Sequence, residues 1–255
     1  MSKIIAITNQ KGGVGKTTTA VNLAASFSAV KRRTMLLDLD PQGNATMGSG
    51  IEKFSASLTS KEILLDAIKI EDAIYKTTFG YDLIASNANL TSAEIRLMQI
   101  EDREYLLKRA LKDIRNNYDY IFIDCPPALN ILTVNALVAA DSVLIPIQCE
   151  YYSLEGLAGL LSTIEHLQRT VNSNLKIEGL LRTMYDGRNR LTIEVSEQLE
   201  EHFVDKLYTT IIPRNVRLAE APSHGLPAMF YDKNSQGAAA YLALAGEIIR
   251  KNYEL

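Results

Sequence analysis

The segment Asn9-Gln10-Lys11-Gly12-Gly13-Val14-Gly15-Lys16-Thr17-Thr18-Thr19 decides the fold of this 255-residue chain. It follows residues 3–8, an apolar run that predicts a short buried strand, and precedes residues 20–30, whose apolar period predicts a helix. Glycines let backbone N–H groups close around an anion, and the helix N-terminus adds partial positive charge. The segment therefore predicts a phosphate-binding loop between the first strand and the first helix.

This loop pattern assigns a chemical role to its last residues. Lys16 is expected to reach the β- and γ-phosphates of a nucleotide, and the Thr17 hydroxyl is expected to help hold Mg²⁺. The alternative is a glycine-rich turn that binds nothing, which the flanking strand and helix disfavour. The predicted nucleotide-binding residues of the loop are Gly12, Gly13, Val14, Gly15, Lys16, Thr17 and Thr18.

The loop departs from the generic pattern, which asks for Gly where this chain has Gln10, and it carries an additional lysine, Lys11. The variant Lys-Gly-Gly-x-Gly-Lys-Thr resembles the deviant Walker A box of the ParA/MinD family of ATPases. The resemblance implies that the chain binds ATP with Mg²⁺ and forms an ATP-bound homodimer. It also implies that Lys11, with Gly12 beside it, crosses the dimer interface to complete the partner's catalytic site.

Length and composition fit one large α/β domain over residues 1–255. The net charge of −3 disfavours a protein that coats nucleic acid by bulk charge, although a local basic patch stays compatible with it. Cys125 and Cys149 lie in apolar runs far apart, which predicts buried thiols in a reducing cytoplasm. Because the sequence opens on a strand pattern, we expect no signal peptide, and no run of 18 apolar residues predicts a membrane span.

A second motif, which is acidic, lies at the end of the strand expected at residues 33–39. Asp38-Leu39-Asp40-Pro41-Gln42-Gly43-Asn44 places two carboxylates where α/β proteins keep their chemistry. Asp40 is a candidate to position the attacking water or to join the Mg²⁺ shell. The alternative is a turn whose aspartates cap the next segment. The motif is similar to the first switch of the ParA/MinD family, and this resemblance favours the catalytic role.

The apolar run 118–124 ends in Asp124 and is closed by Pro126 and Pro127, neither of which can donate to a sheet. An apolar strand ending in Asp is the Walker B arrangement, in which the carboxylate supports Mg²⁺ through its water shell. We therefore predict Asp124 as a metal-site residue. The resemblance implies that the two prolines begin a second switch that couples hydrolysis to shape.

The remaining chain alternates between apolar strand patterns and helical patterns, which predicts a single-domain, doubly wound, mainly parallel sheet flanked by helices. Residues 45–57 are expected to be mobile, Thr59 and Glu62 to form a capping box, and Tyr151 and Tyr152 to be core residues. The further strands are expected at 81–85, 142–148, 176–184 and 207–212, and the helices at 59–68, from 91, at 103–116, 150–171, 192–203 and 237–251.

Basic residues of the last third of the chain are interspersed with acidic ones, so a solvated mixed face is the plain interpretation. Similarity to Soj-type chromosomal ParA proteins implies instead that Arg188 and Arg217 contact double-stranded DNA without sequence preference. It also implies that Pro213 and Asn215 contact adenine, the amide of Asn215 offering a donor and an acceptor, and that Glu150 lies at the dimer interface.

Two absences refine the resemblance. The C-terminal helix has only Arg250-Lys251 as a basic pair, which disfavours a MinD-like membrane anchor. Because the sequence opens on the first strand pattern, we also expect no N-terminal helix-turn-helix of the kind that larger plasmid ParA proteins carry. A Soj-like, nucleoid-associated partition ATPase with a ParB/Spo0J-type partner is the resulting expectation. The alternatives are a MinD-like membrane-associated ATPase, a nucleoid-based positioner of another cargo, and an iron-protein-like reductase, which the placement of the cysteines disfavours. His224 is expected to be structural.

Overall fold

The computed structural model describes residues 2–65 and 68–253. Within them the strands form one seven-stranded sheet in the order β3-β4-β2-β5-β1-β6-β7, and every neighbouring pair is parallel except β3 with β4. This confirms the predicted mainly parallel sheet. The antiparallel edge strand β3 was not predicted. The strands are β1 (Lys3–Ile7), β2 (Thr34–Asp38), β3 (Ile74–Lys76), β4 (Asp82–Ile84), β5 (Tyr120–Asp124), β6 (Ser142–Gln148) and β7 (Lys176–Thr183).

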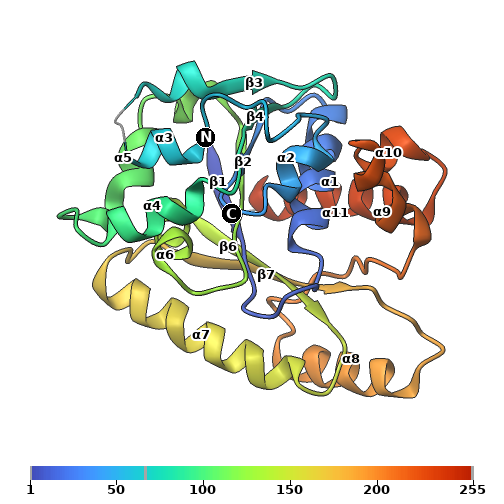
Figure 1. Cartoon of the computed structure of the whole chain (residues 1–255). Coiled ribbons are helices and arrows are strands. Elements are labelled where there is room, and N and C mark those ends of the chain that lie inside the picture. Colours follow the sequence, from blue (N-terminus) through green and yellow to red (C-terminus); the bar gives the residue numbers. More distant parts are fainter. Residues whose placement is uncertain (1, 66–67, 254–255) are drawn as a thin grey trace.

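Helices cover both faces of the sheet, as Figure 1 shows. The central strands β2 and β5 are buried along their whole length, which is why they are continuous apolar runs in the sequence. One face packs against α1 (Lys16–Ala29), α2 (Asn44–Gly48), α9 (Val216–Glu220), α10 (Ala228–Tyr231) and α11 (Gln236–Tyr253). The other packs against α3 (Ser60–Leu65), α4 (Leu90–Leu97), α5 (Leu106–Leu111), α6 (Ile131–Ala139), α7 (Ser153–Thr170) and α8 (Arg190–His202). Short 3₁₀ turns are η1 (Ile70–Ala73), η2 (Arg103–Tyr105), η3 (Arg115–Asn117) and η4 (Ala221–His224).

The register of the central strands gathers the predicted motifs at one edge. Asp124 at the end of β5 is paired with Ile7 of β1 on one side and with Asp38 of β2 on the other. The loops that follow these three strands therefore start side by side at the carboxyl edge, where parallel α/β sheets bind their ligands.

Helix α11 docks on the core through an apolar face. Tyr241, Leu244 and Ile248 are fully buried, and the Tyr241 hydroxyl lies 3.1 Å from the hydroxyl of Thr19 on α1. A contact with α11 thus holds the first turn of α1, directly after the phosphate loop, in place. No helix within the described part of the chain is long and apolar enough to cross a membrane.

The capping box before α3 is formed: the Thr59 N–H donates to the Glu62 carboxylate at 2.8 Å, and the Thr59 hydroxyl accepts from Lys61 N–H at 3.3 Å. Residues 66 and 67, inside the predicted helix 59–68, lie outside the described residues. Cys125 and Cys149 are buried free thiols, as predicted.

The predicted last strand, residues 207–212, is wrong as a continuous strand. The bridges along it are isolated: Leu207 is joined to Leu180 of β7, and Pro213, which follows the segment, is joined to Tyr185, which follows β7. Between them the backbone N–H groups of Thr209 and Thr210 turn to the carboxylate of Glu247 on α11, at 2.8 and 2.9 Å. A side chain from another element therefore takes donors that a strand would have given to the sheet.

Three further expectations were wrong in whole or in part. Residues 45–57 were expected to be mobile, but their start folds as α2, because Thr46 donates both its N–H and its hydroxyl to Asp38. The helix expected over 103–116 is interrupted, because the side chain of Asn135 binds Leu107 N–H and Arg103 C=O in place of helical partners.

The third concerns Tyr151 and Tyr152, which are 73% and 72% exposed instead of belonging to the core. They precede the first residue of α7 and stack edge to face, with ring centroids 5.1 Å apart. This loop lies beyond the part of the sheet that helices cover. The apolar pattern of the sequence therefore does not tell whether its tyrosines are buried.

The Glu247 contact predicts a stability effect that depends on pH. Hydrogen bonds from Thr210 and Thr209 outweigh burial and hold the pKa of Glu247 below its ordinary value of 4.5. Because a carboxylate with a depressed folded pKa stabilises the protein above its unfolded pKa, Glu247→Gln should lower the free energy of unfolding by about 1–3 kcal/mol at pH 7. The difference should shrink as the pH falls through the folded pKa. Urea unfolding measures it, with the exposed Glu201→Gln as control; a loss below about 0.5 kcal/mol at pH 7 would contradict this role.

Candidate nucleotide-binding site

The loop after β1 is fixed to the sheet on two sides. The Asn9 side chain donates to the carbonyl of Pro146 in β6 at 2.7 Å and accepts from Lys11 N–H at 2.9 Å. The Thr183 hydroxyl, at the end of β7, donates to the carbonyl of Val14 at 2.8 Å. The loop is therefore held in shape by its neighbours in the sheet before any ligand arrives.

The glycines give the loop its path. Gly13 and Gly15 have φ values of 74° and 87°, in the left-handed region that favours glycine. Gly15 is also the N-cap of α1 and has no side chain to cap the first N–H groups of that helix. Those groups, with the N–H groups of the loop, remain available to an anion at the helix N-terminus.

Lys16 is the buried cation of the loop. The residue is 7% exposed, and its Nζ donates to the carbonyl of Lys11 at 3.1 Å, across the loop. Burial lowers the pKa of Lys16, whereas the nearby carboxylates of Asp124 and Asp40 and the Cys125 thiol raise it. A buried ammonium at this place is a ready counter-charge for phosphate.

Three acidic side chains gather behind the loop, and two of them are well bonded. Asp38 accepts the N–H and hydroxyl of Thr46 at 2.8 and 2.7 Å, and the N–H of Asp40 at 3.1 Å. Asp40 itself is 8% exposed and accepts the N–H of Gln42 at 2.9 Å, while its carbonyl accepts from Ser86. Both carboxylates are thus oriented by the turn that follows β2.

Asp124 is different, because its carboxylate is fully buried and neither oxygen has a hydrogen-bond partner among the described residues. Burial, followed by the charge of Asp38, raises the pKa of Asp124 well above its ordinary value. The hydroxyl of Thr17 and the ammonium of Lys16 lower it by less, and the Thr17 contact lacks hydrogen-bond geometry. Asp124 therefore lacks a donor or cation that a ligand could supply.

Mg²⁺ fits this arrangement. In phosphate sites it takes one or two carboxylates and completes its shell with water and phosphate oxygens. No group of three His, Cys, Asp or Glu within the described ranges could hold a metal by itself, so a site at Thr17, Asp40 and Asp124 would need the phosphate as well. His224 stacks on Tyr231 with ring centroids 4.9 Å apart, as a structural residue would.

Lys11 and Glu150, the two residues expected at a dimer interface, meet within one chain. The Lys11 ammonium lies 2.5 Å from the Glu150 carboxylate, with the side chains 38% and 51% exposed. An exposed ion pair of this kind contributes only about 0–1 kcal/mol, so a competing anion of higher charge can displace it. Lys11 is therefore held at the rim of the loop and can be released.

The predicted adenine residues lie on the segment beside β7. Pro213 bridges to Tyr185, and Asn215 caps α9 by accepting the N–H of Arg217 at 3.0 Å. The acceptor of Asn215 is thus engaged, which departs from the expectation that donor and acceptor both face a base. A cavity of about 110 Å³ opens beside this segment and is lined by Gln148, Cys149, Glu150, Met184, Asp186, Asn189, Leu191, Thr192 and Arg214.

Sequence reasoning missed several residues of this site. Met184 has φ 49° and accepts from the Gln148 amide at 2.8 Å, which also lies 3.5 Å from the Gly13 carbonyl. Nothing in the sequence indicated Met184, because a left-handed residue is ordinarily glycine or asparagine. Asn9 is a polar residue next to an apolar strand pattern, and this is a signal that the sequence does carry.

Arg188 and Arg217 both lie at the surface and are both paired. Arg188 donates twice to Asp186 at 2.8 Å, and its hydrogen bonds lower the pKa of Asp186 to about 2. Arg217 contacts Glu220 at 2.8 Å and Asp232 at 3.3 Å.

Their two segments are neighbours, because Tyr185 N–H donates to Ile212 C=O and Arg214 N–H donates to Tyr185 C=O, each at 3.0 Å. Arg182, counted with the basic residues of this region in the sequence, is buried and pairs with Glu200. It is a structural residue that ties β7 to α8.

A glycine-rich loop with a buried lysine, at the helix N-terminus and beside strand-end carboxylates, defines a P-loop nucleotide-binding protein. A family model described as an AAA domain matches residues 2–177. Soj of Bacillus subtilis, a sporulation initiation inhibitor protein, is 55% identical over 249 residues, which cover 97% of this chain and 98% of Soj. The chain belongs to the ParA/MinD family of P-loop ATPases.

Two further comparisons extend this result. The chromosome partitioning protein ParA of Caulobacter vibrioides is 48% identical, with 98% of this chain and 94% of ParA covered. The crystal structure of cobyrinic acid a,c-diamide synthase from Mycobacterium smegmatis, with bound ATP analogue and magnesium, has a TM-score of 0.86. It is 34% identical and is aligned over 98% of this chain and 95% of its own.

The unpartnered Asp124 carboxylate predicts a gain in stability on its removal. Asp124→Asn deletes a buried charge next to Asp38, so the ligand-free protein should become more stable at pH 7 by about 1 kcal/mol or more. Urea unfolding without nucleotide or Mg²⁺ measures this, and the exposed Asp113→Asn should change it by less than about 0.5 kcal/mol. An Asp124→Asn protein that is clearly less stable than wild type would show that the carboxylate is satisfied in the free protein.

Proposed function

We propose that this protein is a chromosome-partition ATPase: it hydrolyses ATP slowly with Mg²⁺, dimerises when ATP-bound and binds DNA without sequence preference. The observation that carries the proposal is Lys11, a second loop lysine held at the rim of the site beside the buried Lys16. The names of the relatives that are 55% and 48% identical support partition. The diamide synthase name belongs to a protein of lower identity, 34%, and has less weight.

In this proposal the loop binds the triphosphate through its own groups. The N–H groups of residues 12–18 surround the phosphates, and Lys16 turns its buried ammonium from the Lys11 carbonyl to the β- and γ-phosphates. Mg²⁺, when bound, neutralises phosphate charge and polarises the bond that breaks. Thr17 and Asp124 would hold it, since Asp124 has free oxygens. Asp40, fixed by the Gln42 N–H, would orient the attacking water.

Dimerisation follows from the competition for Lys11. Bound ATP brings negative charge to the loop, and Lys11 exchanges its exposed pairing with Glu150 for the phosphates of the partner subunit's nucleotide. Glu150 then lies at the interface without its own lysine. Hydrolysis removes the γ-phosphate charge, so the exchange reverses and the dimer separates.

DNA binding would depend on the exposed arginines. Arg188 and Arg217 would exchange the carboxylates of Asp186, Glu220 and Asp232 for DNA phosphates, which makes the binding salt-sensitive. The dimer doubles this small patch, which links DNA binding to ATP. The protein would act in the cytoplasm on the nucleoid, and a ParB/Spo0J-type centromere-binding partner would accelerate hydrolysis.

Lys11→Ala separates the two lysines of the loop. Lys11 pairs only with an exposed carboxylate in the free protein, so the variant should bind ATP·Mg²⁺ within about threefold of wild type. Its hydrolysis should fall roughly tenfold or more, because the charge that completes the partner's site is gone. A fluorescent ATP analogue measures binding, and phosphate release measures turnover. Lys16→Ala is the contrasting variant, which should lose binding itself. Normal hydrolysis by Lys11→Ala would remove the shared site from the proposal.

Charge reversal tests the DNA patch. Arg217→Glu should weaken ATP-dependent binding to a random-sequence duplex by about tenfold or more and reduce its salt dependence, because phosphate contacts are lost. Arg190→Glu is the matched control, since Arg190 is also exposed and paired with an acid of its own chain, Glu194. The assay is a gel shift with ADP or ATP. Binding that ignores the nucleotide, or that Arg217→Glu leaves intact, would count against the partition function.

A further inference from the structure

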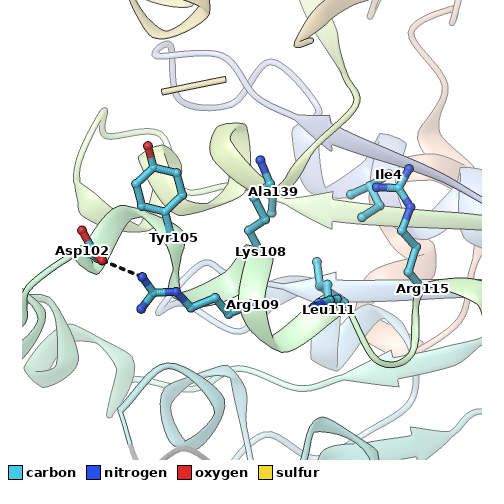
Figure 2. A pocket seen from close by; sticks show the side chains of 9 residues that line it. Ile4, Asp102, Tyr105, Lys108, Arg109, Leu111, Arg115 and Ala139 are labelled. Carbon is cyan, nitrogen blue, oxygen red and sulfur yellow. Dashed lines mark hydrogen bonds and ion pairs between the residues drawn. The ribbon is translucent and has the colours of Figure 1, made fainter. Parts of the chain in front are cut away.

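A second recess lies at the opposite end of β1 from the phosphate loop. It has a volume of about 520 Å³, and Figure 2 shows its lining side chains. Its floor consists of the buried side chains of Ile4 at the start of β1, Leu111 of α5 and Ala139 at the end of α6. Tyr105, Lys108, Lys112 and Arg115 line its side, and we call this recess the α5 groove. None of these residues belongs to the nucleotide site.

The lining of the α5 groove has a regular spacing. Tyr105, Lys108, Lys112 and Arg115 are separated by three, four and three residues. They form one stripe along η2, α5 with its C-cap Lys112, which has helical backbone angles, and η3. In Figure 2 the side chains of Tyr105, Lys108 and Arg115 point to the same side of α5. The stripe places one aromatic ring and three cations along the apolar floor.

The cations of the groove differ in what they already bind. Arg115 pairs with Asp141 at 2.7 Å, and Arg109, which also lines the groove, pairs with Asp102 at 2.7 Å. Lys108 and Lys112 are exposed and have no ion pair within residues 2–65 and 68–253. The two unpaired charges therefore lie in the middle of the groove, between two ion pairs.

The spacing of the two lysines indicates the shape of an anionic ligand. Four residues along a helix advance by about 6 Å. Side chains at alternate positions of an extended peptide are about 6.5–7 Å apart and point the same way. Two carboxylates at such positions can therefore meet Lys108 and Lys112 together.

We propose that the α5 groove binds an extended acidic segment of a partner protein, with carboxylates at alternate positions on Lys108 and Lys112. Asp102 and Asp141 disfavour nucleic acid here, because a continuous phosphate backbone would pass close to these carboxylates and be repelled. The groove lies at the amino end of β1, whereas the nucleotide loop follows its carboxyl end. The partner would therefore dock without covering the ATP site, which separates this inference from the proposed function.

The test uses a fluorescein-labelled peptide, Gly-Glu-Val-Glu-Val-Glu-Gly, and fluorescence anisotropy with the full chain in ADP and Mg²⁺. Wild type should bind it saturably, and the peptide with Gln in place of Glu should bind at least about tenfold more weakly. Lys108→Glu with Lys112→Glu should weaken binding of the acidic peptide by about tenfold or more. Lys69→Glu with Lys176→Glu, a pair of exposed lysines elsewhere, is the matched control and should bind like wild type.

Each result decides the proposal. Equal binding of the Glu and Gln peptides, no binding to wild type at millimolar peptide, or full binding by the Lys108/Lys112 variant would overturn it. So would a labelled random duplex whose binding depends on these lysines while the peptide does not bind. ATP hydrolysis and thermal unfolding of both variants show that the fold is intact. Both double variants leave the residues of the nucleotide site unchanged. Failure of the peptide test would therefore not count against the proposed partition function.

Discussion

The pairing of β2 with β5 in parallel register places two buried carboxylates, Asp38 and Asp124, at adjacent strand ends. Buried like charges repel strongly, and the two carboxylates differ in the hydrogen bonds that compensate this repulsion. Asp38 is bonded by Thr46, whereas Asp124 keeps both oxygens free. The imbalance leaves one place where a cation completes the site, next to the loop that binds phosphate. The rest of the carboxyl edge is arranged around that place.

The two lysines of the loop have distinct surroundings, which explains why one loop can serve two purposes. Lys16 is buried and bonded across the loop, so the fold sets its position in the free protein. Lys11 is held only by an exposed carboxylate, so its position depends on what charge is nearby. In our proposal Lys16 binds the nucleotide, and Lys11 couples nucleotide binding to the contact with another subunit.

The sequence predicted the sheet and the loop because their signals are local: continuous apolar runs for buried strands, and glycines with lysine at a fixed spacing. It failed where distant residues compete for backbone groups. The carboxylate of Glu247 took the N–H groups of the expected last strand, and Asn135 divided an expected helix. Tertiary contacts also determine the pairing of Lys11 with Glu150 and the left-handed backbone of Met184. No sequence pattern therefore predicts these two features.

In our proposal the nucleotide loop is shared between two subunits. Sedimentation equilibrium of the wild-type protein with a non-hydrolysable ATP analogue and Mg²⁺ tests it most directly. We expect a mass near that of one 28.3 kDa chain with ADP and near twice that value with the analogue. A protein that binds the analogue fully and still sediments as a single chain at every concentration would contradict the claim, because Lys11 would then have no second site to complete.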